Sequence, residues 1–587
     1  MTGDTQTRPS RHPETEIAYD AVIVGAGFAG MYMLHCLRQL GLSVRVFEVG
    51  GGVGGTWYWN RYPGARCDVE SMQYSYSFSE ELDQEWRWTE KYAPQAEILS
   101  YANHVADRYD LRRDIHFNTN VTKATFNEDT KRWVIETDHG DRVNAQFCIM
   151  AVGCLSAANK PPFDGLESFK GPVHHTGEWP HDGVDFTGLD VAVIGTGSSA
   201  IQSIPFIAQQ AKSLTVFQRT PNYAVPAWNE KMDPAYERAI KDDYPAFRAK
   251  ARARPTGFYF PFNMESALDA TPEEREQQYD EAWARGGLPF LGAYGDLLFE
   301  KDANDTIAKF ARAKIRAVVD DPATADLLCP DNIFGCKRLC VDTGYFEVYN
   351  QPHVKLVDVS QNPIERFTET GLVANGVEYK VDAAVFATGF AAMTGSFDKI
   401  TIIGRHGQTL REKWRAGPRT YLGLSTVGFP NFFMITGPGS PSVLANMIPS
   451  IEQHVDWMTD CISHMRDIGA ATIEPELKFE DDWVEHVNDV AQVSLRSTCS
   501  SWYVGANIPG RPRIFMPYIG GFPIYVNKCN EVMTNNLEGF TLKDAQNNDG
   551  VNFDVTPRTR WTERWRVPVD INIISPATIA AKRVPVV

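Results

Sequence analysis

The sequence has little of what marks an exported, membrane-spanning or nucleic-acid-binding protein. Its polar amino terminus has no signal-peptide-like apolar stretch, and its most apolar long window, residues 21–40, is interrupted by glycines, a histidine and an arginine. No long lysine or arginine run occurs, the formal charge is −17 and the pI is about 5.3. Nucleic acids and anionic membranes require a basic patch. We therefore expect a cytoplasmic protein with neither partner.

Cysteine is scattered rather than clustered. The ten cysteines of the 587-residue chain include no CxxC pair, and Cys336 and Cys340 lack the partners of a zinc site. The pattern predicts no metal site and reduced, intracellular thiols. The apolar content of 43% and aromatic content of 12% indicate a globular chain, and its length predicts two to four structural units at about 150 residues each.

The segment AVIVGAGFAG, residues 21–30, has the pattern of a dinucleotide-binding turn. A short, β-branched strand leads into Gly25, Gly27 and Gly30, and a helical pattern follows. These glycines allow a tight turn, close approach of a pyrophosphate and close helix–strand packing, respectively. Glu48 ends the next predicted strand, where its carboxylate can accept both ribose hydroxyls. This site suits FAD or NAD.

The pattern recurs in LDVAVIGTGSSA, residues 189–200. Gly195 and Gly197 are followed by Ala200 in place of the third glycine, and the next predicted strand ends at Arg219 rather than at an acid. An acid would repel a 2′-phosphate, whereas arginine can pair with it bidentately, so this site suits NADP. Two such sites in one chain imply a flavin that is reduced by a nicotinamide.

Between these turns lies FKGPVHHTGEWP, residues 169–180. Its Phe169, Gly171, His175, Trp179 and Pro180 form the pattern F-x-G-x-x-x-H-x-x-x-W-P. This resembles the fingerprint of type I Baeyer–Villiger monooxygenases, flavoproteins that insert an oxygen atom beside a ketone carbonyl. The segment GGVGGTWYWNRYPGARCDVES (51–71) resembles the flavin-side loop of that family. Three more segments resemble its phenylacetone and steroid monooxygenase branch, so the resemblance covers about residues 18–540: FGCKR (334–338), RAGPRTYLGLS (415–425) and GPGSPSVLANM (437–447).

The resemblance implies an NADPH- and O2-dependent FAD monooxygenase that converts ketones to esters or lactones. Arg338 matches the family arginine that stabilises the C4a-peroxyflavin anion and then the oxyanion of the adduct, a role that needs a cation unable to lose its proton. Asp68 matches the acid that orients this arginine. Small and aliphatic side chains at Cys154 and in residues 440–447 would suit a bulky or cyclic ketone.

The resemblance also assigns cofactor residues. Lys337 is expected at the NADP 2′-phosphate with Arg219 and Gln218, and Trp502 on a mobile loop that closes over the nicotinamide. The set expected at FAD is Gly25, Gly27, Gly30, Glu48, Thr56, Trp57, Tyr58, Trp59, Asp68, Tyr74, Val121 and Met447. The set expected at NADP is Arg66, Cys67, Gly195, Thr196, Gly197, Ser198, Ser199, Ala200, Ile201, Gln218, Arg219, Thr220, Lys337, Arg338 and Trp502.

His175 could act as a general base, because its ordinary pKa is near neutrality. A histidine between Gly171 and Gly177 on a linker suits a hinge better, and we expect it to control the movement between the two cofactor domains.

The predicted fold is α/β, with two Rossmann-like dinucleotide-binding domains and a helical insertion. The strand in 381–390 is expected to return to the flavin domain, residues 450–500 to form amphipathic helices, and the tail beyond 540 to be an irregular appendage. The expected divisions are 18–150 and 386–540 for FAD, 151–225 (with the linker) and 334–385 for NADP, 226–333 for the insertion, and 541–587 for a C-terminal extension.

Three alternatives are set against this interpretation. A flavin monooxygenase of sulfides or amines would not need an arginine at the peroxide, so Arg338 with Asp68 argues against it. A disulfide reductase would need a CxxC pair. A non-catalytic nucleotide sensor predicts decayed site residues, yet Glu48 and Arg219 are present. The expected partners are a ketone and O2; the oligomeric state is left open and is compatible with a monomer.

Overall fold

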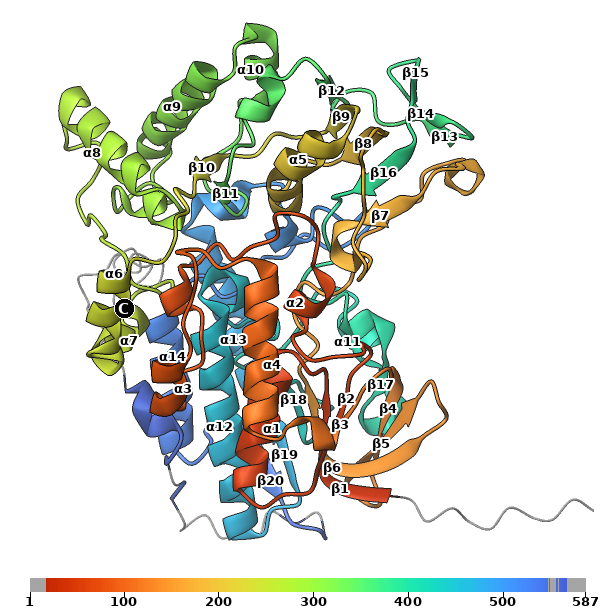
Figure 1. The fold of residues 1–587 in the computed structure, drawn as a ribbon. Helices are drawn as coiled ribbons and strands as arrows, with labels where there is room; N and C mark the ends of the chain where they lie inside the picture. Colours follow the sequence, from red (N-terminus) through yellow and green to blue (C-terminus); the bar gives the residue numbers. More distant parts are fainter. Residues whose placement is uncertain (1–16, 547, 549–555, 558, 567–587) are drawn as a thin grey trace, which may run out of the picture.

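The chain folds around two β-sheets that lie at opposite ends of the molecule (Figure 1). The computed structural model describes residues 17–546, 548, 556–557 and 559–566. No helix in these residues combines the length and the apolar character needed to cross a membrane. The sheets come from the two segments in which the sequence predicts dinucleotide-binding turns.

The larger sheet begins with the first strand of the chain. Parallel pairing runs from Ala21 opposite Val44 to Val24 opposite Phe47, so the buried, β-branched run occupies the middle of the sheet. Helix α1 (Phe28–Gln39) follows the glycine turn and covers one face. The strand order is β17 (Thr401–Ile403), β4 (Val121–Asn127), β5 (Arg132–Thr137), β6 (Arg142–Met150), β1 (Ile17–Val24), β2 (Val44–Phe47) and β3 (Ile115–His116), with β18 (Phe432–Met434) also paired to β6.

The second sheet is parallel throughout, and helix α5 (Ser198–Gln210) begins directly after its glycine turn. The expectation that residues 381–390 return to the flavin domain is wrong: Ala383–Phe386 pairs with Val191–Ile194 inside this sheet. Ala383–Phe386 is a short, apolar strand like those of the larger sheet, and such a pattern does not specify which of the two sheets a strand joins. The order is β12 (Val354–Asp358), β9 (Ser213–Gln218), β8 (Asp190–Ile194), β16 (Ala383–Phe386) and β7 (Val173–His175).

The two glycine turns have the same geometry. Gly25 has φ +104° and Gly195 has φ +110°, conformations that side chains rarely adopt. A Cβ at Gly25 would lie 2.5 Å from the carbonyl oxygen of Ala151, and one at Gly195 would lie 2.5 Å from that of Ala387. Each glycine therefore lets the turn pass beside a neighbouring strand end in its own sheet.

Three small sheets and the remaining helices complete the fold. The small sheets are β10 (Ala224–Pro226) with β11 (Cys340–Asp342); β13 (Arg366–Thr368), β14 (Gly371–Ala374) and β15 (Val377–Lys380); and β19 (Thr472–Pro475) with β20 (Phe540–Lys543). The helices are α2 (Thr56–Trp59), α3 (Glu80–Glu85), α4 (Gln95–Arg108), α6 (Pro234–Lys241), α7 (Tyr244–Arg252), α8 (Pro272–Arg285), α9 (Lys301–Val318), α10 (Pro322–Leu328), α11 (Leu410–Lys413), α12 (Met447–Ile468), α13 (Leu477–Gln492) and α14 (Phe522–Thr534).

The segment expected as a helical insertion contains α6 to α10, and these helices form two separate groups. Helices α8, α9 and α10 extend beside the five-stranded sheet, whereas α6 and α7 lie against the half that holds the larger sheet (Figure 1). Helix α8 starts with a capping box between Thr271 and Glu274, the signal that its sequence carries. From α7, Arg248 donates to the carbonyl oxygen of Tyr76 at 2.7 Å.

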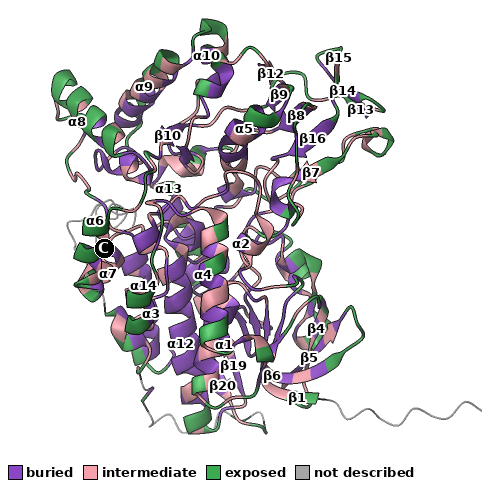
Figure 2. Ribbon diagram, in the orientation of Figure 1, coloured by how far each residue is buried: buried purple, intermediate pink, exposed green. Residues whose placement is uncertain are grey.

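The expectation of amphipathic helices in residues 450–500 holds for α13 but not for α12, which is buried along nearly its whole length (Figure 2). Several of its polar side chains are paired internally instead of facing solvent. His454 accepts a hydrogen bond from the Thr436 N–H at 2.9 Å and lies 2.8 Å from the Tyr525 hydroxyl, and burial lowers its pKa to about 3. Polar residues on a helix therefore did not mark an exposed face.

The described part of the C-terminal extension packs on α12 and is not an irregular appendage. Asp456, fully buried, accepts from Arg564 Nε at 2.6 Å and from Trp565 Nε1 at 2.6 Å. Asp460 accepts the Thr562 backbone N–H at 2.8 Å. Trp565 itself is 0% exposed. The tail therefore supplies the counter-charge that a buried carboxylate on α12 requires.

Two of the connections between the halves, the one that leaves the larger sheet after β6 and the one that returns after β16, run side by side. Ala158 and Phe390 form an antiparallel bridge, flanked by hydrogen bonds from the Asn159 N–H to the Gly389 carbonyl at 2.9 Å and from the Ala391 N–H to the Ala157 carbonyl at 2.8 Å. The outgoing and returning chains thus form a short two-stranded link between the sheets.

Candidate active site

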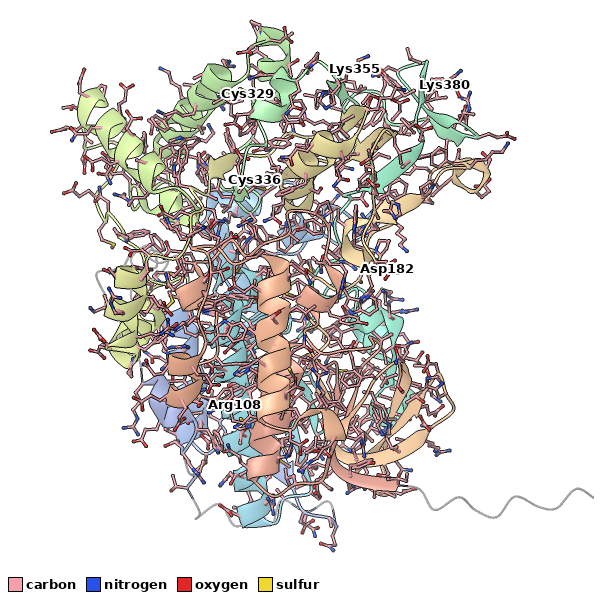
Figure 3. All side chains as sticks on the ribbon, viewed as in Figure 1. Arg108, Asp182, Cys329, Cys336, Lys355 and Lys380 are labelled. Carbon is pink, nitrogen blue, oxygen red and sulfur yellow. A yellow bond between two sulfur atoms is a disulfide. The ribbon has the colours of Figure 1, made fainter. Side chains whose placement is uncertain are left out.

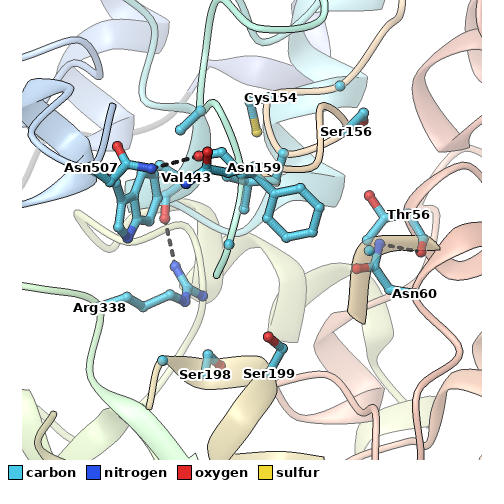
Figure 4. Close-up of a pocket in the computed structure, with 18 of the residues that line it drawn as sticks. Thr56, Asn60, Cys154, Ser156, Asn159, Ser198, Ser199, Arg338, Val443 and Asn507 are labelled. Carbon is cyan, nitrogen blue, oxygen red and sulfur yellow. Dashed lines mark hydrogen bonds between the residues drawn. The ribbon is translucent and has the colours of Figure 1, made fainter. Parts of the chain in front are cut away.

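A single cavity of ≈ 1660 Å³ is lined by residues of both glycine turns. Pockets for one small ligand usually measure about 300–1,000 Å³, so this cavity has room for more than one. Residues from both halves contribute to it, among them Thr56 from one side and Ser198 from the other (Figure 4).

On the side of the larger sheet, Glu48 lies at the carboxyl end of β2. It is buried, and its two carboxylate oxygens accept the N–H groups of Ala26 at 2.6 Å and Gly50 at 2.7 Å. Burial raises its pKa, and these two bonds oppose the rise. Each oxygen keeps further acceptor capacity, so the carboxylate can still accept hydroxyls of a bound ribose.

Most residues expected at FAD line this cavity, and two do not. Gly30 lies inside the helix–strand contact, in keeping with its packing role. The Tyr58 hydroxyl accepts the Gly51 N–H at 3.0 Å, and its ring packs on His181. Those at the cavity wall are Gly25, Gly27, Glu48, Thr56, Trp57, Trp59, Asp68, Tyr74, Val121 and Met447.

On the other side, Arg219 and Lys337 both line the cavity. Burial lowers the pKa of Lys337, and the nearby Arg219 guanidinium lowers it further. An anion such as a phosphate, bound between these two cations, would reduce the repulsion between their charges. The arrangement therefore fits the 2′-phosphate of NADP.

Three residues expected at NADP lie away from the cavity wall. Ala200 and Ile201 are residues of α5 that are buried in the core. The Gln218 side chain donates to the Leu327 carbonyl at 2.7 Å. Those at the wall are Arg66, Cys67, Gly195, Thr196, Gly197, Ser198, Ser199, Arg219, Thr220, Lys337, Arg338 and Trp502.

Arg338 and Asp68, 270 residues apart in sequence, form a bidentate pair in this cavity. Arg338 donates from Nε to Asp68 Oδ2 at 2.6 Å and from Nη2 to Oδ1 at 2.9 Å. Its Nη1 donates to the Val443 carbonyl oxygen at 2.6 Å (Figure 4). Burial acts to lower the pKa of Arg338, but the charge of Asp68 and the hydrogen bonds to Asp68 raise the pKa overall. The site therefore holds a permanent positive charge in a fixed direction.

Four residues of the linker fingerprint, Phe169, Gly171, His175 and Trp179, lie outside the cavity wall, although Gly177 between them is part of it. His175 ends β7 and is buried, its Nδ1 accepts the Gly177 N–H at 2.9 Å, and its Nε2 lies 3.3 Å from the Thr388 hydroxyl on the returning connection. Burial lowers its pKa. Trp179 packs on His174 and Phe186, and Phe169 on Phe367. A Cβ at Gly177 would lie 2.5 Å from the Phe390 ring, so a larger residue there would require that ring to move.

Several features of the site have no motif in the sequence that would predict them. The Val443 carbonyl is a backbone group, and Thr388 has no motif that pairs it with His175. Cys336 and Cys499 form a disulfide, which corrects the expectation that every thiol is reduced. A separation of 163 residues hides such a pair from any spacing rule. In the described residues, no group of three or more histidine, cysteine or acidic side chains could hold a metal ion.

The fold and cavity define an α/β oxidoreductase with two dinucleotide-binding domains. A family model described as pyridine nucleotide-disulphide oxidoreductase matches residues 22–246, which include both glycine turns. The chain is similar to a Baeyer-Villiger monooxygenase of Pseudooceanicola batsensis, at 42% identity over 89% of this chain and 95% of that protein. It is also similar to a phenazine N-monooxygenase of Lysobacter antibioticus, at 40% identity over 89% and 97%.

Among solved structures, oxidized steroid monooxygenase bound to NADP matches with a TM-score of 0.86 and 54% identity, covering 89% of this chain and 99% of that one. The chain belongs to the Baeyer–Villiger monooxygenase family. The family and the α/β fold class with two dinucleotide-binding domains, both predicted from sequence, are thereby confirmed.

Proposed function

We propose that this chain uses FAD, NADPH and O2 to insert one oxygen atom beside a ketone carbonyl, giving an ester or lactone. The observation that carries the proposal is the Arg338–Asp68 pair inside a cavity that both glycine turns line. Glu48 and the turn at Gly25 would hold FAD, and the turn at Gly195 with Arg219 would hold NADP. We infer accordingly that the larger sheet belongs to the FAD domain and the five-stranded sheet to the NADP domain.

Bound FAD, once reduced by NADPH, would supply the chemistry that activates O2. The protein would supply the electrostatics. Arg338 cannot give up its proton at any ordinary pH, so it can stabilise an oxyanion that develops at the ketone carbonyl without protonating it. Asp68 fixes the plane of the guanidinium through two bonds, and the Val443 carbonyl fixes its remaining amino group.

The test measures the product and the origin of its oxygen. Purified protein with FAD, NADPH and a cyclic ketone under ¹⁸O2 is expected to give a lactone carrying one labelled atom, in proportion to the NADPH consumed. Arg338→Met should reduce lactone formation by about 10²–10³-fold, as for other lost oxyanion-stabilising groups. Absence of lactone from every cyclic, aryl and aliphatic ketone tried would reject the proposal.

A second candidate is oxidation of nitrogen or sulfur, favoured by the similarity to a phenazine N-monooxygenase. A heteroatom attacks an electrophilic oxygen, so the reaction does not need a cation to stabilise an oxyanion. Arg338→Met should therefore spare sulfide or amine oxidation while it lowers ketone oxidation by about 10²–10³-fold. Equal loss of both activities would show that Arg338 has a more general role, for example in cofactor binding.

We also infer that His175 couples the two domains. Its Nε2 faces Thr388 on the returning connection, and it lies outside the cavity wall. His175→Ala is expected to lower the ester formed per NADPH consumed more than it lowers NADPH consumption itself. An unchanged ratio would argue against this role.

A further inference from the structure

The Cys336–Cys499 disulfide lies where two walls of the cavity meet. Cys336 precedes Lys337 and Arg338, Cys499 precedes Trp502 by three residues, and both cysteines line the cavity. Their Cα atoms are 5.7 Å apart. Cys336 lies in the interior of the molecule and Cys329 nearer the outer helices (Figure 3). The other eight cysteines of the chain are free.

The two walls in question are residues 334–338, with Cys336 and Arg338, and residues 495–507, with Cys499 and Trp502. The second of them has little regular structure of its own. Residues 495–507 contain only two short 3₁₀ turns, Leu495–Thr498 and Trp502–Val504. The wall is attached to the segment before Arg338 by a hydrogen bond from Arg496 Nε to the Gly335 carbonyl at 2.8 Å. Such a bond contributes about 1 kcal/mol, so it can open repeatedly, whereas a disulfide cannot.

We propose that Cys336 and Cys499 form a reversible thiol–disulfide switch that fixes the cavity wall bearing Trp502 to the one bearing Arg338. The inference rests on the proposed function, because the oxidant is hydrogen peroxide, the product of NADPH oxidation by O2 when no ketone is oxygenated. Both thiols line the cavity in which such peroxide would form, and they are the cavity cysteines that lie close enough to be joined.

The chemistry balances with peroxide as the oxidant. One thiolate attacks a peroxide oxygen and becomes a sulfenic acid with loss of water; the second thiol attacks that sulfur, forms the S–S bond and releases a second water. Overall, two thiols and one H2O2 give one disulfide and two waters. An external dithiol reverses the step by thiol–disulfide exchange and is itself oxidised.

The consequence is a change in ligand exchange at the cavity. A nicotinamide dinucleotide that lies beside Trp502, Lys337 and Arg338 has to pass between the two walls. Once these are joined covalently, we expect NADP⁺ release and turnover to slow by roughly tenfold or more. NADPH oxidation that yields peroxide instead of ester would thereby slow its own rate, since the peroxide would form the disulfide that restricts NADP⁺ release.

The test compares oxidised and reduced forms of the same full-length, FAD-loaded protein. One sample is treated with H2O2 and another with dithiothreitol, and both are desalted. Thiol alkylation followed by peptide mass spectrometry should show a linked Cys336–Cys499 peptide pair only after peroxide. Stopped-flow displacement of NADP⁺ should be slower in the oxidised sample, and dithiothreitol should restore the faster rate.

Variants show whether this pair is responsible. Cys336→Ser and Cys499→Ser should each remove the rate difference between oxidised and reduced samples, whereas Cys329→Ser, a free and half-buried cysteine outside the cavity, should keep it. Failure to link the two peptides, or linkage without any effect on NADP⁺ release, would overturn the inference. Linkage with slower release in a protein that oxidises no ketone would reject the proposed function and leave the switch standing.

Discussion

Replacing Asp68 by asparagine tests whether the Arg338 guanidinium has to be held in place. Asparagine keeps the shape of the side chain but removes the charge and turns one acceptor into a donor, so at most one of the bonds at 2.6 and 2.9 Å can survive. The variant therefore changes the orienting force with little change in packing.

The size of the effect follows from the burial of the pair. Unit charges about 4 Å apart attract by about 4 kcal/mol at an effective dielectric constant near 20. The Arg338 and Asp68 side chains are 28% and 20% exposed, and solvent screening at such a site leaves roughly half, or about 2 kcal/mol. If that energy holds the guanidinium at the developing oxyanion, its loss lowers kcat/KM for the ketone by about 30-fold.

The assay measures lactone by gas chromatography alongside NADPH consumption. The matched control is Asp305→Asn, which removes an acid from an exposed pair with Lys301 on α9 and should change the rate less than twofold. A rate for Asp68→Asn within threefold of wild type, with Arg338→Met still inactive, would refute the reasoning: Arg338 would then act without being oriented by Asp68.

Three other predictions concern cofactor choice and stability. Arg219→Ala should lower the ratio of kcat/KM for NADPH to that for NADH by about tenfold or more, because a bidentate phosphate partner is lost; steady-state kinetics with both nucleotides measures it. His454 has a folded-state pKa of about 3, below its ordinary value, so stability falls as the pH drops below about 6.5 because the unfolded chain takes up the proton first. His454→Gln should flatten this fall by about 2 kcal/mol between pH 6.5 and 5 in denaturant titrations, and an unchanged slope would contradict it. Arg564→Ala should cost about 3 kcal/mol, measured by chemical denaturation, because it leaves the Asp456 carboxylate buried without its cation; an unaltered midpoint would show that the tail does not stabilise α12.

The local features that the sequence predicted correctly depend on contacts near in the chain. A β-branched strand that meets Gly25 and is followed by a helical pattern specifies the turn by backbone geometry alone, and the same holds at Gly195. The position of Glu48 beside this turn could be predicted as well, because a residue at the end of a parallel strand lies at the same edge of the sheet as the preceding turn.

What the sequence missed depends on long-range pairing. Partners far away in the chain determine three features that the sequence did not predict. These are the pairing of residues 383–386 with the second sheet, the burial of α12 and the packing of Trp565. Helix α12 is instructive because its acids and histidines predict an exposed face, whereas other segments bring in the groups that satisfy them. Polarity alone cannot separate a solvated side chain from one that is paired in the interior.

The paired connections at Ala158 and Phe390 limit how the two sheets can move relative to each other. A single connecting chain would act as a swivel and leave all three rotations free. Two chains bonded edge to edge form a ribbon, which resists shear and bending within its own plane and yields mainly to bending across it. His175 and Thr388 lie beside this ribbon. The segment that carries α6 and α7 also joins the two halves and restricts their relative motion further. A nicotinamide carried by one sheet would therefore approach a flavin carried by the other over a narrow range of directions.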